Sequence, residues 1–360
     1  MNNFDLTALA VSMVCPNNIV KFDTDKGYPG VYVRIPKMTM AQLIDGGSNS
    51  VHPAFIVNGT EVDEVLIGKY QAHNYGGKLY SLPGVDPAAS ADFDAFTTRG
   101  FATGEGFHEI TAAEWGLIAL ICKKNGTLPY GNNNYGKDSR ENGYKAIPSM
   151  ARDSNGRIQR VATGTGPLTW SHDRTLEGIW DLNGNVWEWI GGLRFVKGEL
   201  QILENNNAAD PANSQAAGSS QWKAIDGTTG QLIAPDGNGT TANSLKLDFV
   251  SNKWQWITGA ISSSVDDYRS CSFSDITCAA TVCAAAKELL YAYALAPDST
   301  TFDYEGDIFY LNNGADERLA CRGGYWYYGA DNGVFSFIGN YARSLAYDRI
   351  GGRSAFVDLP

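Results

Sequence analysis

Alternating apolar and polar positions recur in short runs along the chain and predict short β-strands joined by tight turns. Residues 31–35 alternate in this way and stop at Pro36, which cannot donate to a sheet. Residues 55–57 and 60–62 flank Asn58-Gly59, a pair that suits a two-residue hairpin turn. Further extended segments are expected at 63–70, 186–189, 245–250 and 308–311, with a second hairpin at 193–202 about Lys197-Gly198.

Two segments carry helical signals. Thr111 and Glu114 have the spacing of a capping box, and Gly126 is a natural C-terminal cap. The apolar positions that share one face of this helix are Trp115, Ile118, Ala119 and Cys122. Residues 275–295 are alanine-rich, so we expect a second helix there, with Leu289, Leu290 and Tyr293 facing the core.

One apolar run, residues 6–14, stands near the start of the sequence. No Lys or Arg precedes it, so it lacks the basic region of a signal peptide, and it is too short to cross a bilayer. We expect residues 1–20 to form a first strand or an N-terminal docking arm. Because no later stretch is long and apolar enough to insert into a membrane, action outside a cell would require release by lysis or on a particle.

Composition narrows the function classes. The chain has 360 residues with 43% hydrophobic positions, which is enough for a large core, and 40 glycines, which indicate many turns. The net charge is −11 and no run of Lys or Arg occurs, which excludes a nucleic-acid partner or an anionic membrane surface.

The six cysteines do not form a metal or redox motif. No two stand at C-x-x-C spacing, and no H-E-x-x-H pattern accompanies the four histidines. Buried, reduced thiols are therefore expected. A bridge from Cys271 to Cys278 or to Cys283 stays open as an alternative.

The stretch from 322 to 353 interleaves two kinds of residue. One kind is suited to a rigid frame: Arg322, Gly323, Gly324, Trp326, Gly329, Val334, Phe335, Phe337, Arg343, Ile350, Gly351 and Arg353. The other is rich in Tyr, Ser, Asp and Arg, the mixture that antibody paratopes use because tyrosine loses little side-chain entropy on binding. An aromatic core with ordinary loops is the alternative, since clustered aromatic side chains are often buried. Residues 132–144 are also rich in Gly, Asn and Tyr; we expect a solvated loop, with a contribution to a binding surface as the alternative.

Glu188 stands between Trp187 and Trp189 in the segment 178–189. A carboxylate buried there must be paired, because an isolated buried charge is costly. Two partners are open from the sequence: an arginine or a bound cation.

Three motifs together resemble the formylglycine-generating-enzyme (sulfatase-modifying factor) branch of the C-type lectin fold. They are GFHEITAAEW (106–115), GIWDLNGNVWEW (178–189) and the RGGYW, ARS and IGGRSAF elements within 322–356. The similarity covers about 100–192 and 304–357 and is weaker over 20–99. It implies an α+β C-type lectin-like domain at 21–360, with short antiparallel sheets, two main helices and a long peripheral insertion at 195–303. It also implies that the chain ends lie near one another.

The C-terminal segment resembles the variable proteins of diversity-generating retroelements, in which adenine-directed mutagenesis rewrites such a segment. The frame R-G-G-x-W-x-x-G-A-x-x-G-V-F and the A-R-S and I-G-x-R-S-A elements match, while Gly352 departs from the Phe that is common in that family. The resemblance implies a diversified, solvent-accessible ligand-binding segment at 322–356. Its variable positions are Tyr325, Tyr327, Tyr328, Asp331, Asn332, Ser336, Ile338, Gly339, Asn340, Tyr341, Leu345, Ala346, Tyr347, Asp348, Arg349 and Gly352.

The residue types in this segment agree with that mechanism. Randomising the adenines of an Asn codon that ends in C can give Tyr, Asp, Ser, Ile, Leu, Ala, Gly or Arg, but never Lys, Glu, Gln, Met or Trp. Residues 322–353 contain no Lys, Glu, Gln or Met, and their one Trp belongs to the frame. An ordinary surface strip usually contains Lys or Glu.

The resemblance therefore predicts a non-enzymatic protein that binds a protein or another surface ligand on a target cell, carried on a phage virion or a bacterial surface. The alternatives are an oxidase like the parent enzyme, which needs a pair of thiols for copper, and a calcium-dependent lectin. No Cys follows Cys321, and no catalytic residue is assigned. No cofactor is required. The family's structural calcium site would map to the carbonyl groups of Asn183, Gly184 and Val186 and the side chain of Glu188, oxygen ligands that suit calcium.

Overall fold

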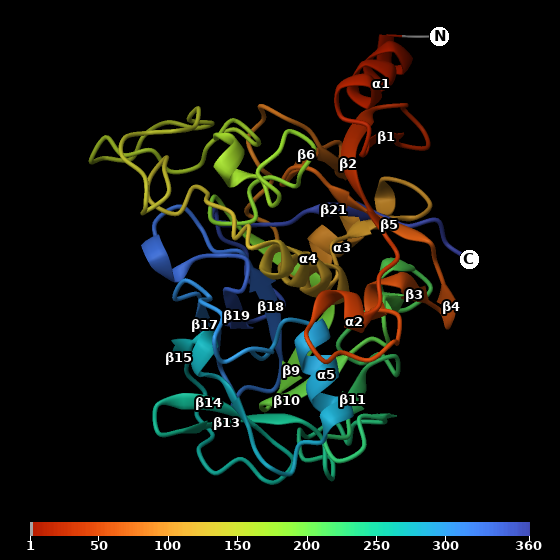
Figure 1. The fold of residues 1–360 in the computed structure, drawn as a ribbon, viewed down its shortest axis with the longest axis vertical. Helices are drawn as coiled ribbons and strands as arrows, with labels where there is room; N and C mark the ends of the chain where they lie inside the picture. The colour runs from red at the N-terminus through yellow and green to blue at the C-terminus, as the bar shows by residue number, and fades with distance from the viewer. Residues whose placement is uncertain (1–2) are drawn as a thin grey trace.

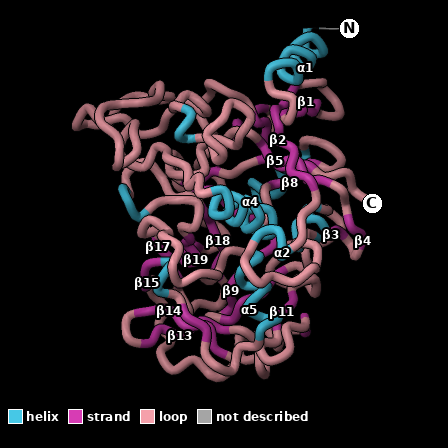
Figure 2. Tube along the Cα trace, viewed as in Figure 1, coloured by secondary structure: helices cyan, strands magenta, loops and turns pink. Residues whose placement is uncertain are grey.

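Helices and strands alternate with long loops in an α+β arrangement (Figures 1 and 2), as expected for the fold class. The computed structural model describes residues 3–360. Within that range the α-helices are α1 (Asn3–Val14), α2 (Met40–Leu43), α3 (Phe93–Ala102), α4 (Ala112–Asn125) and α5 (Ala284–Ala292). The short antiparallel hairpins are β3 (Ile56–Val57) with β4 (Thr60–Glu61) and β6 (Ala72–Tyr75) with β7 (Lys78–Ser81). The turn at Asn58-Gly59 is confirmed.

A five-stranded sheet brings the two ends of the domain together. Its order is β1 (Asn18–Phe22), β2 (Pro29–Pro36), β5 (Glu64–Gly68), β21 (Ser354–Phe356) and β8 (Phe107–Glu109). The C-terminal strand thus lies between two strands from the first third of the chain. Lys21 Nζ is 3.8 Å from a carboxylate oxygen of Asp358, so the chain near residue 20 does lie close to its end.

A twelve-stranded sheet forms the other large element. Its main path is β15 (Arg269–Ser272), β17 (Ile308–Leu311), β19 (Phe337–Tyr341), β18 (Arg318–Arg322), β9 (Trp187–Val196), β10 (Glu199–Ile202), β13 (Lys246–Val250), β14 (Lys253–Ile257) and β16 (Thr277–Cys278); β11 (Lys223–Ile225), β12 (Leu232–Ile233) and β20 (Ile350–Gly351) join at its side. β17–β19, β14–β16 and β9–β20 pair in parallel, unlike the antiparallel pairing that was expected throughout. The hairpin about Lys197-Gly198 is confirmed as β9–β10.

α4 begins and ends where the sequence indicates. Thr111 Oγ1 accepts from Glu114 N (3.2 Å), Glu114 Oε2 accepts from Thr111 N (3.0 Å), and Gly126 has a left-handed φ of 62°. The helix lies near the middle of the molecule (Figure 1) and is buried on nearly every side rather than on one face.

The segment 195–303 was expected to lie at the periphery, and this prediction is wrong. Trp254, Trp256 and Leu290 belong to the same core cluster as α4, and that cluster also includes Val33 and Val357. Trp256 Nε1 donates to Leu295 O (3.0 Å). Residues before and after position 200 therefore share one hydrophobic core, as expected for a single domain. Two separate cores divided near residue 200 would have contradicted that expectation. That these residues are an insertion, and that the domain starts at residue 21, stay predictions.

The helix expected at 275–295 is much shorter, because α5 covers only Ala284–Ala292. Thr277 and Cys278 pair with β14 instead, and Cys283 Sγ caps α5 by accepting from Ala286 N (3.4 Å). β-branched residues such as Thr277 fit a strand better than a helix. All six cysteines are free thiols, so neither bridge from Cys271 forms.

The N-terminal segment is α1, a helix that projects from the body of the molecule (Figure 1), so the interpretation as a first strand is wrong. Alanine, leucine and methionine favour a helix over a strand. Leu6, Leu9, Met13 and Val14 are exposed. Residues 1 and 2 of the expected arm lie outside the described range. No helix within residues 3–360 has the length and hydropathy to span a bilayer.

Candidate ligand-binding face

Most frame residues of the segment 322–356 lie in the interior, with Gly329 and Arg343 as the half-buried exceptions. Trp326, Val334, Phe335, Phe337 and Ile350 are each 3% exposed or less, as expected. Arg343 is only half-buried, and its guanidinium contacts Glu317 (2.8 Å) and Asp94 (2.7 Å). The segment therefore rests on a fixed hydrophobic base.

Arg322 connects this segment to the chain around α5. It is fully buried, and its Nη2 donates to the carbonyl oxygens of Tyr293 (2.7 Å) and Ala294 (2.9 Å). Burial lowers the pKa of Arg322 to about 9, with the carboxylate of Asp307 opposing that change. The guanidinium is thus held by main-chain dipoles that do not depend on the side chains at 293 and 294.

Glu188 is paired with Arg353, and an arginine is one of the two partners left open by the sequence. Arg353 donates through Nε (2.9 Å) and Nη2 (2.7 Å) to the two carboxylate oxygens, and both side chains are fully buried. Gln71 Nε2 donates to Glu188 Oε1 (3.0 Å) and to the carbonyl oxygens of Val186 (2.9 Å) and Gly184 (3.3 Å).

The oxygens expected to bind calcium therefore do not fit that role in this arrangement. The amide nitrogen of Gln71 lies where three of them converge, and the Glu188 carboxylate already has a cationic partner. Asn183 contributes its side chain to a different network, in which its Nδ2 donates to Pro129 O (3.0 Å). Among residues 3–360, no three His, Cys, Asp or Glu side chains group into a metal site.

Asp181, in the same segment, is a buried carboxyl group that we expect to make stability depend on pH. It is fully buried, Oδ2 accepts from Gly164 N (2.8 Å), and Oδ1 has no hydrogen-bond partner in the described part of the chain. Burial raises its pKa from 3.8 to about 6. Because folding raises this pKa, the folded state binds the proton of Asp181 more tightly than the unfolded state does. The resulting stabilisation is complete below pH ~4 and is lost as the pH rises through about 6.

When the pH rises from 4 to 7, we therefore expect the free energy of unfolding of wild type to fall by roughly 2 kcal/mol more than that of Asp181→Asn, whose side chain stays neutral. Urea unfolding of both proteins at the two pH values measures the difference. Identical pH dependence in wild type and variant would show that Asp181 is not the group responsible.

Five tyrosines and one arginine of the segment form what we call the tyrosine face: Tyr325, Tyr327, Tyr328, Tyr341, Tyr347 and Arg349. The rings of Tyr325 and Tyr327 are 4.4 Å apart between centroids, and those of Tyr325 and Tyr328 are 4.6 Å apart, both edge to face. Arg349 Cζ lies 5.4 Å from the ring centroid of Tyr325 and 4.5 Å from that of Tyr347. Tyr341 packs edge to face on Trp189, at 6.0 Å.

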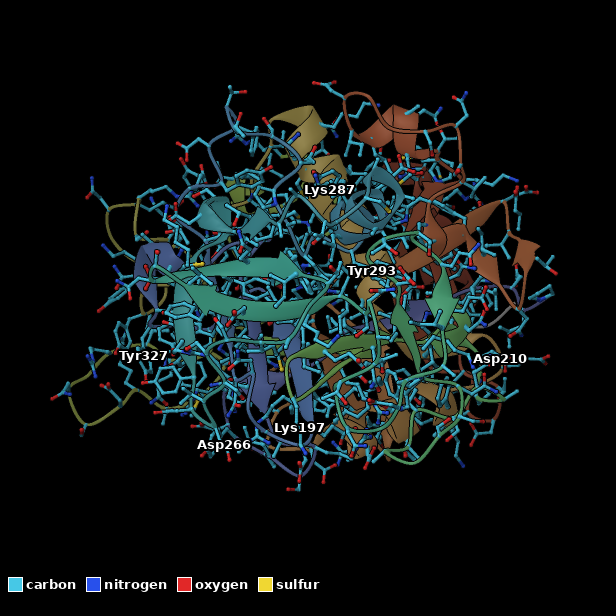
Figure 3. The ribbon with its side chains drawn as sticks, turned by 90° about the horizontal axis from the view of Figure 1, so that it is seen from below. Lys197, Asp210, Asp266, Lys287, Tyr293 and Tyr327 are labelled. Carbon is cyan, nitrogen blue, oxygen red and sulfur yellow. The ribbon has the colours of Figure 1, made fainter. Side chains whose placement is uncertain are left out.

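Exposure differs strongly within this face. Tyr327 and Tyr347 are 45% and 43% exposed, whereas Tyr325 is 2% exposed beneath its neighbours. Figure 3 shows Tyr327 at the edge of the molecule and Tyr293 towards its middle. Burial raises the pKa of Tyr325, Tyr328 and Tyr341, so their hydroxyl groups stay protonated, and remain hydrogen-bond donors, even in moderately alkaline solution.

Main-chain carbonyl groups fix the loops that carry these side chains. Donors outside the segment bond to carbonyl oxygens within it, and each such bond is independent of the side chain at the accepting position. The pairs are Tyr135 N to Trp326 O (2.7 Å), Trp187 N to Arg349 O (2.9 Å), Ser90 N to Tyr347 O (3.0 Å), Arg160 Nη1 to Asp348 O (2.8 Å), Phe93 N to Arg343 O (3.3 Å) and Ala72 N to Gly352 O (2.9 Å).

The predicted variable positions fall into three groups. Those exposed to solvent are Tyr327, Asp331, Ala346, Tyr347 and Asp348. Those half-buried are Tyr328, Asn340, Tyr341, Leu345 and Arg349. Those buried, against the expectation of an accessible surface, are Tyr325, Asn332, Ser336, Ile338, Gly339 and Gly352.

The buried positions have structural reasons. Asn332 Nδ2 donates to Tyr325 O (2.6 Å), and Ser336 Oγ donates to Asp331 O (2.8 Å), so both side chains hold the loop. Ile338 and Gly339 lie in the interior strand β19. A Cβ atom on Gly352 would lie 2.9 Å from the Phe96 ring, so a larger residue requires Phe96 to move.

Three aromatic residues beside the face were not among the predicted site residues. Tyr135 stacks on Tyr327 at 5.9 Å, Tyr310 stacks on Tyr328 at 5.9 Å, and Tyr268 packs edge to face on Tyr310 at 6.0 Å. The composition of 132–144 was a signal for Tyr135. Nothing local in the sequence marks Tyr268 or Tyr310, because the pairing of β15 with β17 and of β17 with β19 brings them here.

The fold and the face together define an α+β protein that displays aromatic side chains on loops of fixed backbone. No family model matches the chain, and no curated protein sequence matches it. Solved structures that are similar to it include the following two. One is variable protein 1 of Treponema denticola, with a TM-score of 0.34 and 12% identity over 95% of this chain and 99% of that chain. The other is the Major Tropism Determinant P3c variant, with a TM-score of 0.31 and 10% identity over 93% and 67%. At these scores the likeness assigns neither a fold family nor a function.

Proposed function

We propose that this chain is a ligand-binding variable protein with a C-type lectin fold of the formylglycine-generating-enzyme branch, whose exposed face a retroelement diversifies. One observation carries the proposal: exposed Tyr327 and Tyr347 stand on loops held by carbonyl bonds to residues outside 322–356. Tyrosine and arginine supply most of the binding energy in many interfaces. A fixed backbone keeps the ordering cost of binding low.

The ligand is a protein or another component of a target-cell surface, and the carrier is a phage virion or a bacterial surface. The residue types of 322–353, limited to products of adenine randomisation outside the frame, support diversification. A near-copy of the codons for 322–356 that differs only at adenines, beside a reverse-transcriptase gene, is the expected genomic trace.

Binding is favoured over oxidase chemistry by the state of Cys321. Its thiol is fully buried in β18, and burial raises its pKa well above the usual range. The thiolate, which is the form that attacks substrates and binds copper, is therefore disfavoured there.

Truncating an exposed tyrosine should weaken binding without unfolding the protein. We expect Tyr327→Ala or Tyr347→Ala to reduce affinity for target cells by about 30-fold, with the melting temperature almost unchanged. The measurement is flow cytometry of fluorescently labelled protein on a panel of intact bacterial cells. Tyr75→Ala, at a 58% exposed tyrosine on β6, is the matched control and should bind like wild type.

The control distinguishes loss of a specific binding contact from loss of the non-specific adhesion that any exposed tyrosine could provide. If both face variants bind like wild type, or if their truncation melts the protein, the proposed function is wrong and the tyrosines serve only the core.

A further inference from the structure

This inference rests on the proposed function and concerns the extent of the binding face. Six tyrosine rings lie in one unbroken series of contacts, which we call the tyrosine strip: Tyr135, Tyr327, Tyr325, Tyr328, Tyr310 and Tyr268. Successive ring centroids are 5.9, 4.4, 4.6, 5.9 and 6.0 Å apart. Only the middle three rings belong to the segment 322–356.

One end of the strip comes from the loop at 131–138. The ring of Tyr135 lies nearly parallel to that of Tyr327, at 10°, and the guanidinium of exposed Arg157 lies 4.1 Å from the Tyr135 centroid. Tyr135 N donates to Trp326 O (2.7 Å), and Gly329 N donates to Asn133 O (2.9 Å). The loop and the diversified segment are therefore fixed to each other through main-chain groups.

The other end comes from the chain before β15 and from β17. Tyr310 is directly opposite Ile338 in the parallel pair β17–β19, so its ring is positioned by the sheet. Tyr268 is 60% exposed, and among the described aromatic residues it contacts Tyr310 alone. Because most of its side chain is exposed, Tyr268 contributes little to the stability of the fold. In Figure 3, Asp266, two residues before Tyr268, lies on the same side of the view as Tyr327.

We propose that the strip is a composite interface for a protein partner, with constant flanks and a variable centre. Tyr135 with Arg157 at one end, and Tyr268 with Tyr310 at the other, contact the partner whatever residues occupy the accessible central positions 327 and 328. The flanks provide baseline affinity for a class of partner proteins, and the centre selects among them. A small ligand covers only part of the strip, whereas a protein interface engages 20–30 residues a side and concentrates its energy in Tyr and Arg.

Alanine variants at the flanks test the composite interface. Tyr135→Ala and Tyr268→Ala should each weaken binding to intact bacterial cells by about tenfold, and Tyr75→Ala should leave it unchanged. Tyr268→Ala should also keep the wild-type melting temperature, because the side chain is exposed.

The outcomes separate this inference from the proposed function. If Tyr327→Ala loses binding while both flank variants bind like wild type, the constant flanks are wrong and the proposed function stands. If the flank variants, Tyr327→Ala and Tyr347→Ala all bind like wild type, both fail.

The class of partner is tested by cross-linking. A photo-reactive amino acid at 268 and, separately, at 327 should capture the same adduct from intact cells, and treating the cells with protease before cross-linking should abolish it; the same probe at 75 should capture none. An adduct that still forms on protease-treated cells but is lost when the cells are first oxidised with periodate identifies a polysaccharide and overturns the protein partner. Different adducts from 268 and 327 overturn a single interface.

Discussion

Replacing Trp326 with alanine is expected to lower the free energy of unfolding by about 3–5 kcal/mol and to abolish binding through the tyrosine face. Trp326 is 3% exposed, and its ring packs edge to face on Tyr325 at 5.4 Å. Its removal leaves a cavity under the aromatic rings that the surrounding loops cannot fill. Urea unfolding measures the loss.

Tyr327→Ala is the matched control for this experiment, because the two positions are adjacent in the chain and differ in burial. We expect its free energy of unfolding to stay within about 0.5 kcal/mol of wild type. If the exposed position costs more stability than the buried one, the assignment of frame and face is reversed.

Replacing Arg353 with methionine is expected to destabilise the fold by about 3–5 kcal/mol, because Glu188 then remains buried without its cationic partner. The carbonyl oxygens of Gly68 and Trp180 also lose the donors that Arg353 supplies at 2.9 Å each. Chemical unfolding at neutral pH is the measurement.

The double variant Glu188→Leu with Arg353→Met removes both charges and should recover part of this loss. A double variant as unstable as the sum of the two single variants would show that the pair is not coupled. A calcium-dependent rise in the melting temperature of wild type would show instead that a cation reaches the oxygens around Gln71.

Local signals in the sequence predict local structure well. The turn at Asn58-Gly59 and the capping box of Thr111 depend on residues within four positions, and both are confirmed. The region before α5 shows the opposite case. Its alanines favour a helix, but pairing of Thr277 with Gln255 in β14 outweighs that preference, and no local pattern reports a strand partner so far along the chain.

The difference between local and long-range determinants also explains which site residues were predicted correctly. Residue type identified the buried frame and the exposed tyrosines at 327 and 347. It did not distinguish Asn332 and Ser336 from adaptable polar contacts, because their hydrogen bonds to the loop backbone exist only in the folded chain. Tyr268 and Tyr310 were missed because strand order in the large sheet, rather than their sequence neighbours, places them beside Tyr328.

The main-chain anchoring of the loops has a consequence for how such a protein evolves. A carbonyl oxygen accepts the same hydrogen bond whichever side chain stands beside it, so replacements at 327, 347 and 348 leave these bonds in place. Most random substitutions in a protein reduce its stability. In a pool of variants of this chain we expect most members with changes at these exposed positions to remain folded and to differ in what they recognise. Descendants of this chain can then differ widely in the ligands they recognise while they share the same fold.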